Sequence, residues 1–265
     1  MREDFANDLR RVWSPIASTT ASINEHWVEA EKVDRTIVVA FAAPASGLNV
    51  PNEYVADYVK KHEEKLIGFA SVDPRDPRAC VEFEHSIREL GLKGLKLGPI
   101  YQQFDPTDRR YYPLYDKAEE LEVPILWHMG ATFVANSPLR YSQPILLDEI
   151  SAAFEGTKMI IAHMGHPWYE EAAVVVRKQP NVYADVAGIH FRPWQLYNML
   201  RCAMEYGVED KLLFGTDFPF ATVESTIEGL KRVNRVVDGT CLPQIPRQVV
   251  ERIIQRDSLK ILGLG

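Results

Sequence analysis

Short apolar segments recur along the chain, and their starting points lie 23 to 35 residues apart. Several are apolar at nearly every position, which is typical of strands covered on both faces. Segments with the 3.6-residue periodicity of helices lie between them, at residues 78–90, 113–121, 146–154, 169–178, 193–206 and 222–234. Seven strands are therefore predicted, at residues 37–43, 67–72, 94–98, 124–130, 159–165, 182–188 and 212–218.

Alternating strands and helices at this spacing predict an α/β fold with a parallel sheet and right-handed crossovers. Seven such units follow one another without a break in composition, which favours a closed barrel over an open sheet. We therefore expect one TIM-type (β/α)8 barrel domain over residues 1–265. Such a barrel needs eight strands. Residues 1–36 contain a helix-like segment at 23–32 but no convincing strand before it, so the first strand is predicted to be missing or altered.

Composition narrows the class of partner. The 265 residues are 46% apolar and 25% charged, as in a globular protein. Thirty Lys and Arg against 37 Asp and Glu give a net charge of −7, and the scattered basic residues argue against nucleic acid. No apolar run approaches the roughly 20 residues that span a bilayer. With three widely spaced cysteines and no disulfide framework, a cytoplasmic protein is expected, and a homodimer is the predicted assembly.

Three polar residues stand at the ends of otherwise apolar predicted strands. His128 and His163 each precede Met-Gly, and Asp217 precedes Phe-Pro. Because reactive groups of parallel barrels lie at the carboxyl ends of the strands, these side chains are expected to share one pocket. A lone histidine is more often a core residue, but three polar strand ends are hard to explain by packing, since their burial costs free energy.

Two imidazoles and a carboxylate at the carboxyl ends of the strands can have two chemical functions. They can bind a divalent ion, most simply zinc with manganese as the alternative, because neutral imidazole and carboxylate suit these metals. They can also form a metal-free acid/base site in which Asp217 orients a histidine. The metal is preferred, because a buried anion needs a compensating charge. By contrast His26, His62 and His85 lie in charge-rich helical segments and are predicted to be solvated.

Further residues are candidates for substrate binding. Lys96 ends a predicted strand and could bind a carboxylate, or could extend its ammonium to solvent. Trp168 is predicted to form an apolar wall, whereas Trp127 is expected, by strand alternation, to face a helix. Arg192 follows the seventh predicted strand and could bind a carboxylate in bidentate fashion. His166 is predicted to have a structural role.

Eight motifs occur in the order in which one known family has them: NEY at 52–54, GFASVDP at 68–74, GLKL at 94–97, YPLY at 112–115, PILLD at 144–148, AHMGHPW at 162–168, PNVY at 180–183 and FGTDFP at 214–219. The chain resembles the amidohydrolase-related family that includes aminocarboxymuconate-semialdehyde decarboxylase. The likeness runs from about residue 27 to the C-terminus, and the sixth and eighth motifs are its most specific parts.

The resemblance implies a metal-dependent barrel enzyme that hydrolyses or decarboxylates small, often carboxylated aromatic or unsaturated compounds. By that likeness His128 would be a metal ligand, His163 a catalytic histidine near the metal-bound water, and Asp217 a ligand and proton acceptor. The family's first strand ends in a His-x-His pair that supplies two further metal ligands, and this chain has no His-x-His. Metal occupancy is therefore in question, since tight binding usually takes three or four protein ligands.

Two explanations of the missing pair stay open: the sequence begins inside a longer protein, which we prefer, or the protein has lost the metal together with the activity. The leading functional hypothesis is a metal-dependent hydrolase of a small, carboxylated compound. The alternative is a non-oxidative decarboxylase on the same scaffold. A second alternative is a metal-free barrel that binds a small molecule without catalysis.

Overall fold

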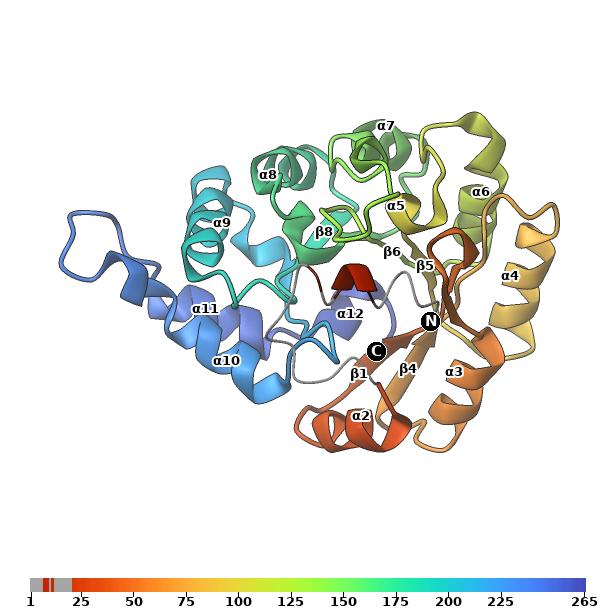
Figure 1. Cartoon of the computed structure of the whole chain (residues 1–265), viewed down its shortest axis with the longest axis horizontal. Helices are drawn as coiled ribbons and strands as arrows, with labels where there is room; N and C mark the ends of the chain where they lie inside the picture. Colours follow the sequence, from red (N-terminus) through yellow and green to blue (C-terminus); the bar gives the residue numbers. More distant parts are fainter. Residues whose placement is uncertain (1–6, 10, 12–20) are drawn as a thin grey trace.

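The structure, a computed structural model, describes residues 7–9, 11 and 21–265 of the chain. Seven parallel strands form its centre, and helices surround them (Figure 1). β1 pairs with β4, β5 to β9 pair in chain order, and a parallel bridge between Ala70 and Leu95 joins the two groups. These strands are β1 (Thr36–Val39), β4 (Leu66–Phe69), β5 (Leu95–Leu97), β6 (Ile125–Trp127), β7 (Met159–Ile161), β8 (Val182–Asp185) and β9 (Leu212–Leu213).

The number and order of the seven predicted strands and the (β/α)8 type of barrel are confirmed. Several strands end earlier than predicted, most of all the last one, which contains only Leu212–Leu213, and the first predicted strand is divided. Residues 37–43 are divided at Ala40 between β1 and β2 (Phe41–Ala43), and after β2 the chain turns back at Gly47, whose φ is +74°. β2 then pairs antiparallel with β3 (Leu48–Val50). Within the described part of the chain, no ladder of hydrogen bonds joins β9 to β1. The ring of strands is open there, at a place that we call the β9–β1 seam.

The helices follow the strands in the predicted alternation, and α3, α5, α11 and α12 add to the predicted set. In the described part of the chain, no helix is long and apolar enough to cross a membrane. The α-helices are α2 (Ile23–Ala30), α3 (Asn52–Lys60), α4 (Ala79–Arg88), α5 (Pro99–Gln102), α6 (Tyr112–Glu120), α7 (Leu146–Ala153), α8 (Tyr169–Lys178), α9 (Pro193–Tyr206), α10 (Val223–Lys231), α11 (Arg247–Gln255) and α12 (Ser258–Leu262). The 3₁₀ helices are η1 (Pro44–Ser46), η2 (Arg109–Tyr111), η3 (Leu139–Tyr141), η4 (Ala162–Gly165), η5 (Glu209–Lys211) and η6 (Val233–Val237).

Local sequence sets where several helices begin and end. The side chain of Ser22 accepts a hydrogen bond from the backbone N–H of Glu25, and the Glu25 carboxylate accepts one from Ser22, so a capping box starts α2. Thr222 and Ser225 form the same reciprocal cap at α10. Gly207 ends α9 in the left-handed conformation that glycine adopts without a steric penalty.

Strand alternation divides the core into two layers. Leu97 and Trp127 point outward into the cluster that includes the surrounding helices, and the ring of Trp127 meets Tyr115 of α6 edge-on, with ring centroids 5.2 Å apart. The prediction that Trp127 faces a helix is therefore confirmed. The inner layer fills the barrel, and the C-terminal segment containing α12 contributes to it. Its buried members are Ile67, Phe69, Ile160, Leu213 and Leu262.

Candidate active site

Polar side chains replace apolar ones where the inner face of the barrel reaches the carboxyl ends of the strands. Lys96 lies on β5, and His128 lies two residues after Leu126, so both belong to the inward-facing set. Asp185 ends β8, again two residues after an inward-facing residue, Tyr183. Because parallel strands place their carboxyl ends at one rim, these groups converge on the mouth of the barrel.

The two predicted strand-end histidines lie side by side at this rim. The ring centroids of His128 and His163 are 5.1 Å apart, and the ring of Tyr101, from α5, lies edge-on to His128 at 4.8 Å. Burial, followed by His163 and Lys96, lowers the pKa of His128 well below its ordinary value. His128 is therefore a neutral imidazole at physiological pH, able to accept a hydrogen bond or to bind a cation through a ring nitrogen.

Asp185 fixes the position of His163. Its Oδ1 accepts hydrogen bonds from the backbone N–H of His163 at 2.8 Å and of Ala187 at 3.0 Å. The Nδ1 of His163 lies 2.9 Å from the carbonyl oxygen of Ala187, so a neutral ring has its proton on Nδ1 and an accepting Nε2. These bonds offset the strain of His163 and Met164, whose φ angles of +56° and +43° are left-handed.

Asp217 completes the group at the rim. The φ of Asp217 is +62°. The backbone of Gly188 lies close to its carboxylate: a Cβ atom added to Gly188 would be 3.0 Å from the Oδ2 of Asp217. Burial raises the pKa of Asp217, and Asp185 raises it further, whereas His163 and Lys96 oppose the rise. A carboxyl group in this setting holds its proton to a higher pH than an exposed aspartate.

Lys96 is the cation of the site. It is only 8% exposed, and burial lowers its pKa from 10.5 to about 8, although Asp185 and Asp217 favour the charged form. At pH 7 it is still mostly protonated. The barrel mouth therefore contains the buried ammonium group of Lys96, which interacts electrostatically with the carboxyl groups of Asp185 and Asp217 and with the neutral imidazole of His128.

The structure brings His128, His163, Asp217 and Lys96 together, and it places the remaining predicted residues on the loops around them. Trp168 is half-buried just before α8. Arg192 is half-buried just before α9 and close enough to His166 to act on it electrostatically. Burial, then Arg192 and His163, lowers the pKa of His166 to about 4. The substrate-binding roles of Trp168 and Arg192 stay predictions.

Three histidines were predicted to be solvated, and the structure agrees only for His85, which is exposed. His26 is partly buried, and its Nδ1 lies 2.9 Å from the hydroxyl of Tyr58. The ring of His62 stacks on Trp27 with centroids 3.7 Å apart. Both histidines lie where α2 packs against α3 and its C-terminal end, a tertiary contact that charge pattern alone does not reveal.

Two residues of the site were missed by the sequence analysis. Asp185 is the last residue of an apolar strand, whereas His128 and Asp217 come shortly after the ends of their strands. The search for polar residues at strand ends could therefore have found Asp185 as well. Tyr101 had no such signal, because it lies on a four-residue helix after β5 and reaches His128 only through the fold.

The candidate metal ligands are of a suitable chemical type for a divalent metal ion, but there are too few of them among the described residues. His128 and Asp217 are ligand types that suit zinc or manganese. Among the residues that the structure describes, however, no three His, Cys, Asp or Glu side chains are arranged to hold a metal. The buried ammonium of Lys96, which acts on both His128 and Asp217, adds a cost to placing a second cation beside it. The described residues therefore do not complete a metal centre.

Comparison with known proteins decides the family. The sequence profile described as amidohydrolase matches residues 28–264. The chain belongs to the amidohydrolase family. This confirms the family predicted from the motifs. A curated relative of this amidohydrolase, gamma-resorcylate decarboxylase from Polaromonas sp. (strain JS666 / ATCC BAA-500), is 24% identical over 227 residues. The alignment covers 65% of this chain and 66% of that relative, just under two thirds of its length.

Solved structures agree with the barrel fold of this amidohydrolase. An uncharacterized TIM-barrel protein from Bordetella bronchiseptica superposes with a TM-score of 0.74 at 22% identity, over 92% of this chain and 83% of that one. Dihydroxybenzoic acid decarboxylase from Polaromonas sp. JS666, solved with manganese and the inhibitor 2-nitroresorcinol, gives a TM-score of 0.67 at 17% identity. That match covers 99% of this chain and 94% of the decarboxylase.

Proposed function

We propose that this amidohydrolase, as one barrel domain, is a non-oxidative decarboxylase of a small carboxylated aromatic acid. The sequence analysis placed hydrolysis first and decarboxylation second. The names of the curated and structural relatives, gamma-resorcylate decarboxylase and dihydroxybenzoic acid decarboxylase, favour the second reaction.

The observation that carries the proposal is the placement of the buried ammonium of Lys96 and the half-buried carboxyl group of Asp217 at one rim, close enough to act on each other electrostatically. Decarboxylation of an aromatic acid adds a proton to the ring carbon that carries the carboxylate. The carbon–carbon bond then breaks, its electron pair returns to the ring, and carbon dioxide leaves. The reaction needs a cation that binds an anionic oxygen of the substrate, and an acid close to the ring. Lys96 and Asp217 supply these two groups.

Each residue of the site has a distinct part in this proposal. The Lys96 ammonium binds an anionic oxygen of the substrate. The carboxyl group of Asp217, whose pKa is raised by burial, donates the proton to the ring carbon. The accepting Nε2 of His163 binds a substrate hydroxyl group, since Nδ1 is held by the carbonyl of Ala187. Neutral His128 and Tyr101 form the wall beside the ring.

The predicted divalent metal ion has the least support from the described residues, because they do not supply a complete set of ligands. Zinc was placed first, whereas the ion bound in the structural relative is manganese. His128 and Asp217 are the residues of this chain that would contact such an ion, and no third ligand accompanies them in the described part. The proposed steps therefore depend on the side chains alone.

The test is an assay of the full chain against hydroxybenzoates, including 2,6-dihydroxybenzoate, and against muconate-like acids and lactones. We expect carbon dioxide and the decarboxylated phenol in equal amounts from at least one hydroxybenzoate. Lactone opening without carbon dioxide release would restore the hydrolase hypothesis. Binding of the acids without any turnover, measured by calorimetry, would favour the non-catalytic barrel. Lys93→Met, which alters an exposed lysine just before β5, is the matched control for Lys96→Met.

A further inference from the structure

The segment that carries Asp217 runs along the β9–β1 seam. β9 contains only two residues, and the chain from 214 to 222 then passes to α10 without a strand conformation. On the side toward β1, the described residues offer it no ladder of backbone hydrogen bonds. Since Asp217 itself has a left-handed φ of +62°, this segment needs other contacts to keep one conformation.

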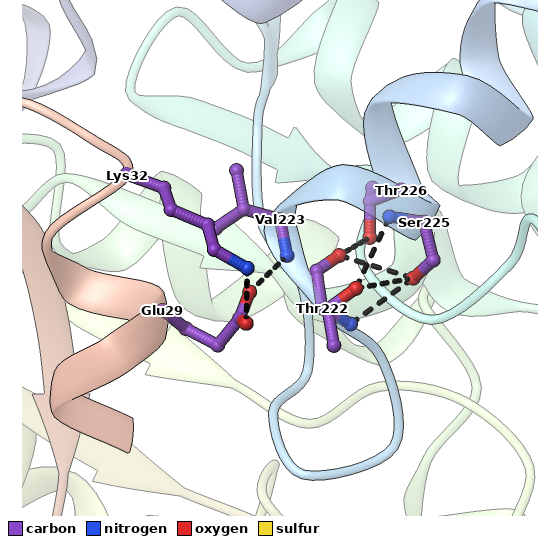
Figure 2. Close-up of polar contacts among 6 residues, drawn as sticks. All are labelled: Glu29, Lys32, Thr222, Val223, Ser225 and Thr226. Atoms are coloured by element: carbon purple, nitrogen blue, oxygen red, sulfur yellow. Dashed lines mark hydrogen bonds and ion pairs between the residues drawn. The ribbon is translucent and has the colours of Figure 1, made fainter. Parts of the chain in front are cut away.

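Glu29, on α2, supplies a contact from across the seam. It is 8% exposed, and its Oε2 accepts a hydrogen bond of 2.7 Å from the backbone N–H of Val223, 194 residues later in the chain. Its Oε1 accepts a 2.6 Å bond from the ammonium of Lys32 (Figure 2). Val223 is the first residue of α10, whose early N–H groups have no partner inside the helix. A carboxylate at this position also matches the positive end of the helix dipole.

The local N-terminal cap of α10 does not involve the backbone N–H of Val223. Thr222 and Ser225 bond reciprocally to each other's backbone N–H groups, as Figure 2 also shows. Thr226 adds a hydroxyl bond to the carbonyl of Thr222. The N–H of Val223 lies outside this local set, and the hydrogen bond that it donates to Glu29 ties the start of α10 to α2.

His26 makes a second contact between α2 and the same segment. It lies three residues before Glu29, hence on the same face of the helix. Its ring meets the ring of Phe218 edge-on at 5.4 Å, and its Nδ1 lies 2.9 Å from the Tyr58 hydroxyl. Phe218 follows Asp217 directly, so α2 contacts the segment both beside the acid and at its far end.

We propose that α2 is the positioning element for Asp217, with Glu29 and His26 holding residues 214–222 where strand pairing does not. This inference rests on the proposed decarboxylase, in which Asp217 is the proton donor. Glu29 and His26 touch no reacting atom in this scheme and act only through the segment. A proton donor displaced by about 1 Å can lose about 100-fold in rate, so such a contact matters for turnover.

Val223→Pro is the sharpest variant, because it removes the N–H that donates to Glu29, while the proline ring replaces the buried valine side chain with an apolar group of similar size. Proline is favoured at the first position of a helix, and Thr222 already has the extended conformation that a following proline requires, with φ −101° and ψ 164°. We expect kcat to fall by about tenfold or more while KM changes by less than about threefold. The proposed substrate contact of Lys96, on β5, is not altered by this change.

Three variants in α2 or directly after it accompany Val223→Pro. Glu29→Ala is expected to reproduce the kcat defect, and Glu29→Gln, which keeps an accepting oxygen, to restore most of the rate. Glu31→Ala alters an exposed carboxylate at the end of the same helix and should leave kcat unchanged. If Val223→Pro fails to fold, the Ala and Gln pair at position 29 still decides the question.

Hydrogen–deuterium exchange provides a readout that is independent of activity. In Glu29→Ala and Val223→Pro, peptides covering 214–226 should exchange faster, while peptides from β5 and β8 keep their wild-type rates. Equal acceleration throughout the barrel would mean that Glu29 only stabilises the fold, and this would overturn the proposal, as would unchanged exchange at 214–226. If wild-type protein releases no carbon dioxide from any acid tested, the proposed function fails, yet the exchange result still decides the positioning role.

Discussion

Replacing Lys96 by methionine tests the electrostatics of the barrel mouth most directly. Methionine is apolar and of similar length, so the change removes the charge while the side chain still fills much of the space. Lys96 is 8% exposed, and burial lowers its pKa to about 8 despite the nearby carboxyl groups of Asp185 and Asp217. The folded protein therefore holds this proton more weakly than the unfolded chain does.

The size and sign of the effect follow from that difference. A pKa that is lower by about 2.5 in the folded protein corresponds to about 3 kcal/mol of stability, because one pKa unit is worth about 1.4 kcal/mol. Between pH 8 and 10.5 the unfolded chain binds a proton that the folded chain has lost. The free energy of unfolding therefore rises with pH in this range. From pH 7 to pH 9.5 we expect the free energy of unfolding of the wild type to rise by about 2 kcal/mol more than that of Lys96→Met.

Urea denaturation of both proteins at pH 7, 8, 9 and 9.5 measures this gain. Groups that titrate in both proteins contribute equally to the two free energies of unfolding, so their contributions cancel in the difference. Tyr101, whose pKa is raised to about 12 by burial, is one such group. Lys93→Met should show no comparable trend. In the decarboxylase assay Lys96→Met should raise KM, because the cation that binds the substrate is gone. A stability difference between wild type and Lys96→Met that does not vary with pH would refute the placement of Lys96 as a buried cation.

Three further predictions concern other parts of the molecule. Asp217→Asn should lower kcat for carbon dioxide release by about 100-fold or more, because it removes the proton donor; a smaller loss would assign that role elsewhere. Trp127→Ala should lower the free energy of unfolding by about 3 to 5 kcal/mol, measured in urea, because Trp127 is fully buried against Tyr115; an effect below about 1 kcal/mol would contradict that packing. Calorimetric titration with manganese chloride should show at most weak binding that His128→Ala diminishes, and tight stoichiometric binding would show that residues outside the described part complete a metal site.

Periodicity along the chain was enough to predict the strands and most of the helices. Buried parallel strands are apolar throughout and amphipathic helices repeat every 3.6 residues, so both signals are local. The helices at 169–178 and 193–206 were predicted with the bounds that the structure has. The antiparallel hairpin of β2 and β3 was missed, because its short strands continue the apolar run of β1 and only the backbone turn at Gly47 separates them.

The candidate site was partly visible for the same reason. A polar residue at the end of an apolar strand is a local signal, and it is enough to predict His128, His163 and Asp217 as site residues from the sequence. The pairing of α2 with the start of α10 had no such signal, because Glu29 and Val223 are 194 residues apart and an acidic residue on a helix normally faces solvent.

The sequence by itself determined the order of strands and helices, the barrel type, the family and the identity of three polar strand ends. Only the tertiary structure decided that Lys96 points into the mouth, that Asp185 holds His163, and that α2 reaches across the β9–β1 seam. The physical reason is that periodicity and motifs record which face of each element is apolar. Burial, pKa and hydrogen bonding depend instead on distances between residues that the chain brings together only when it folds.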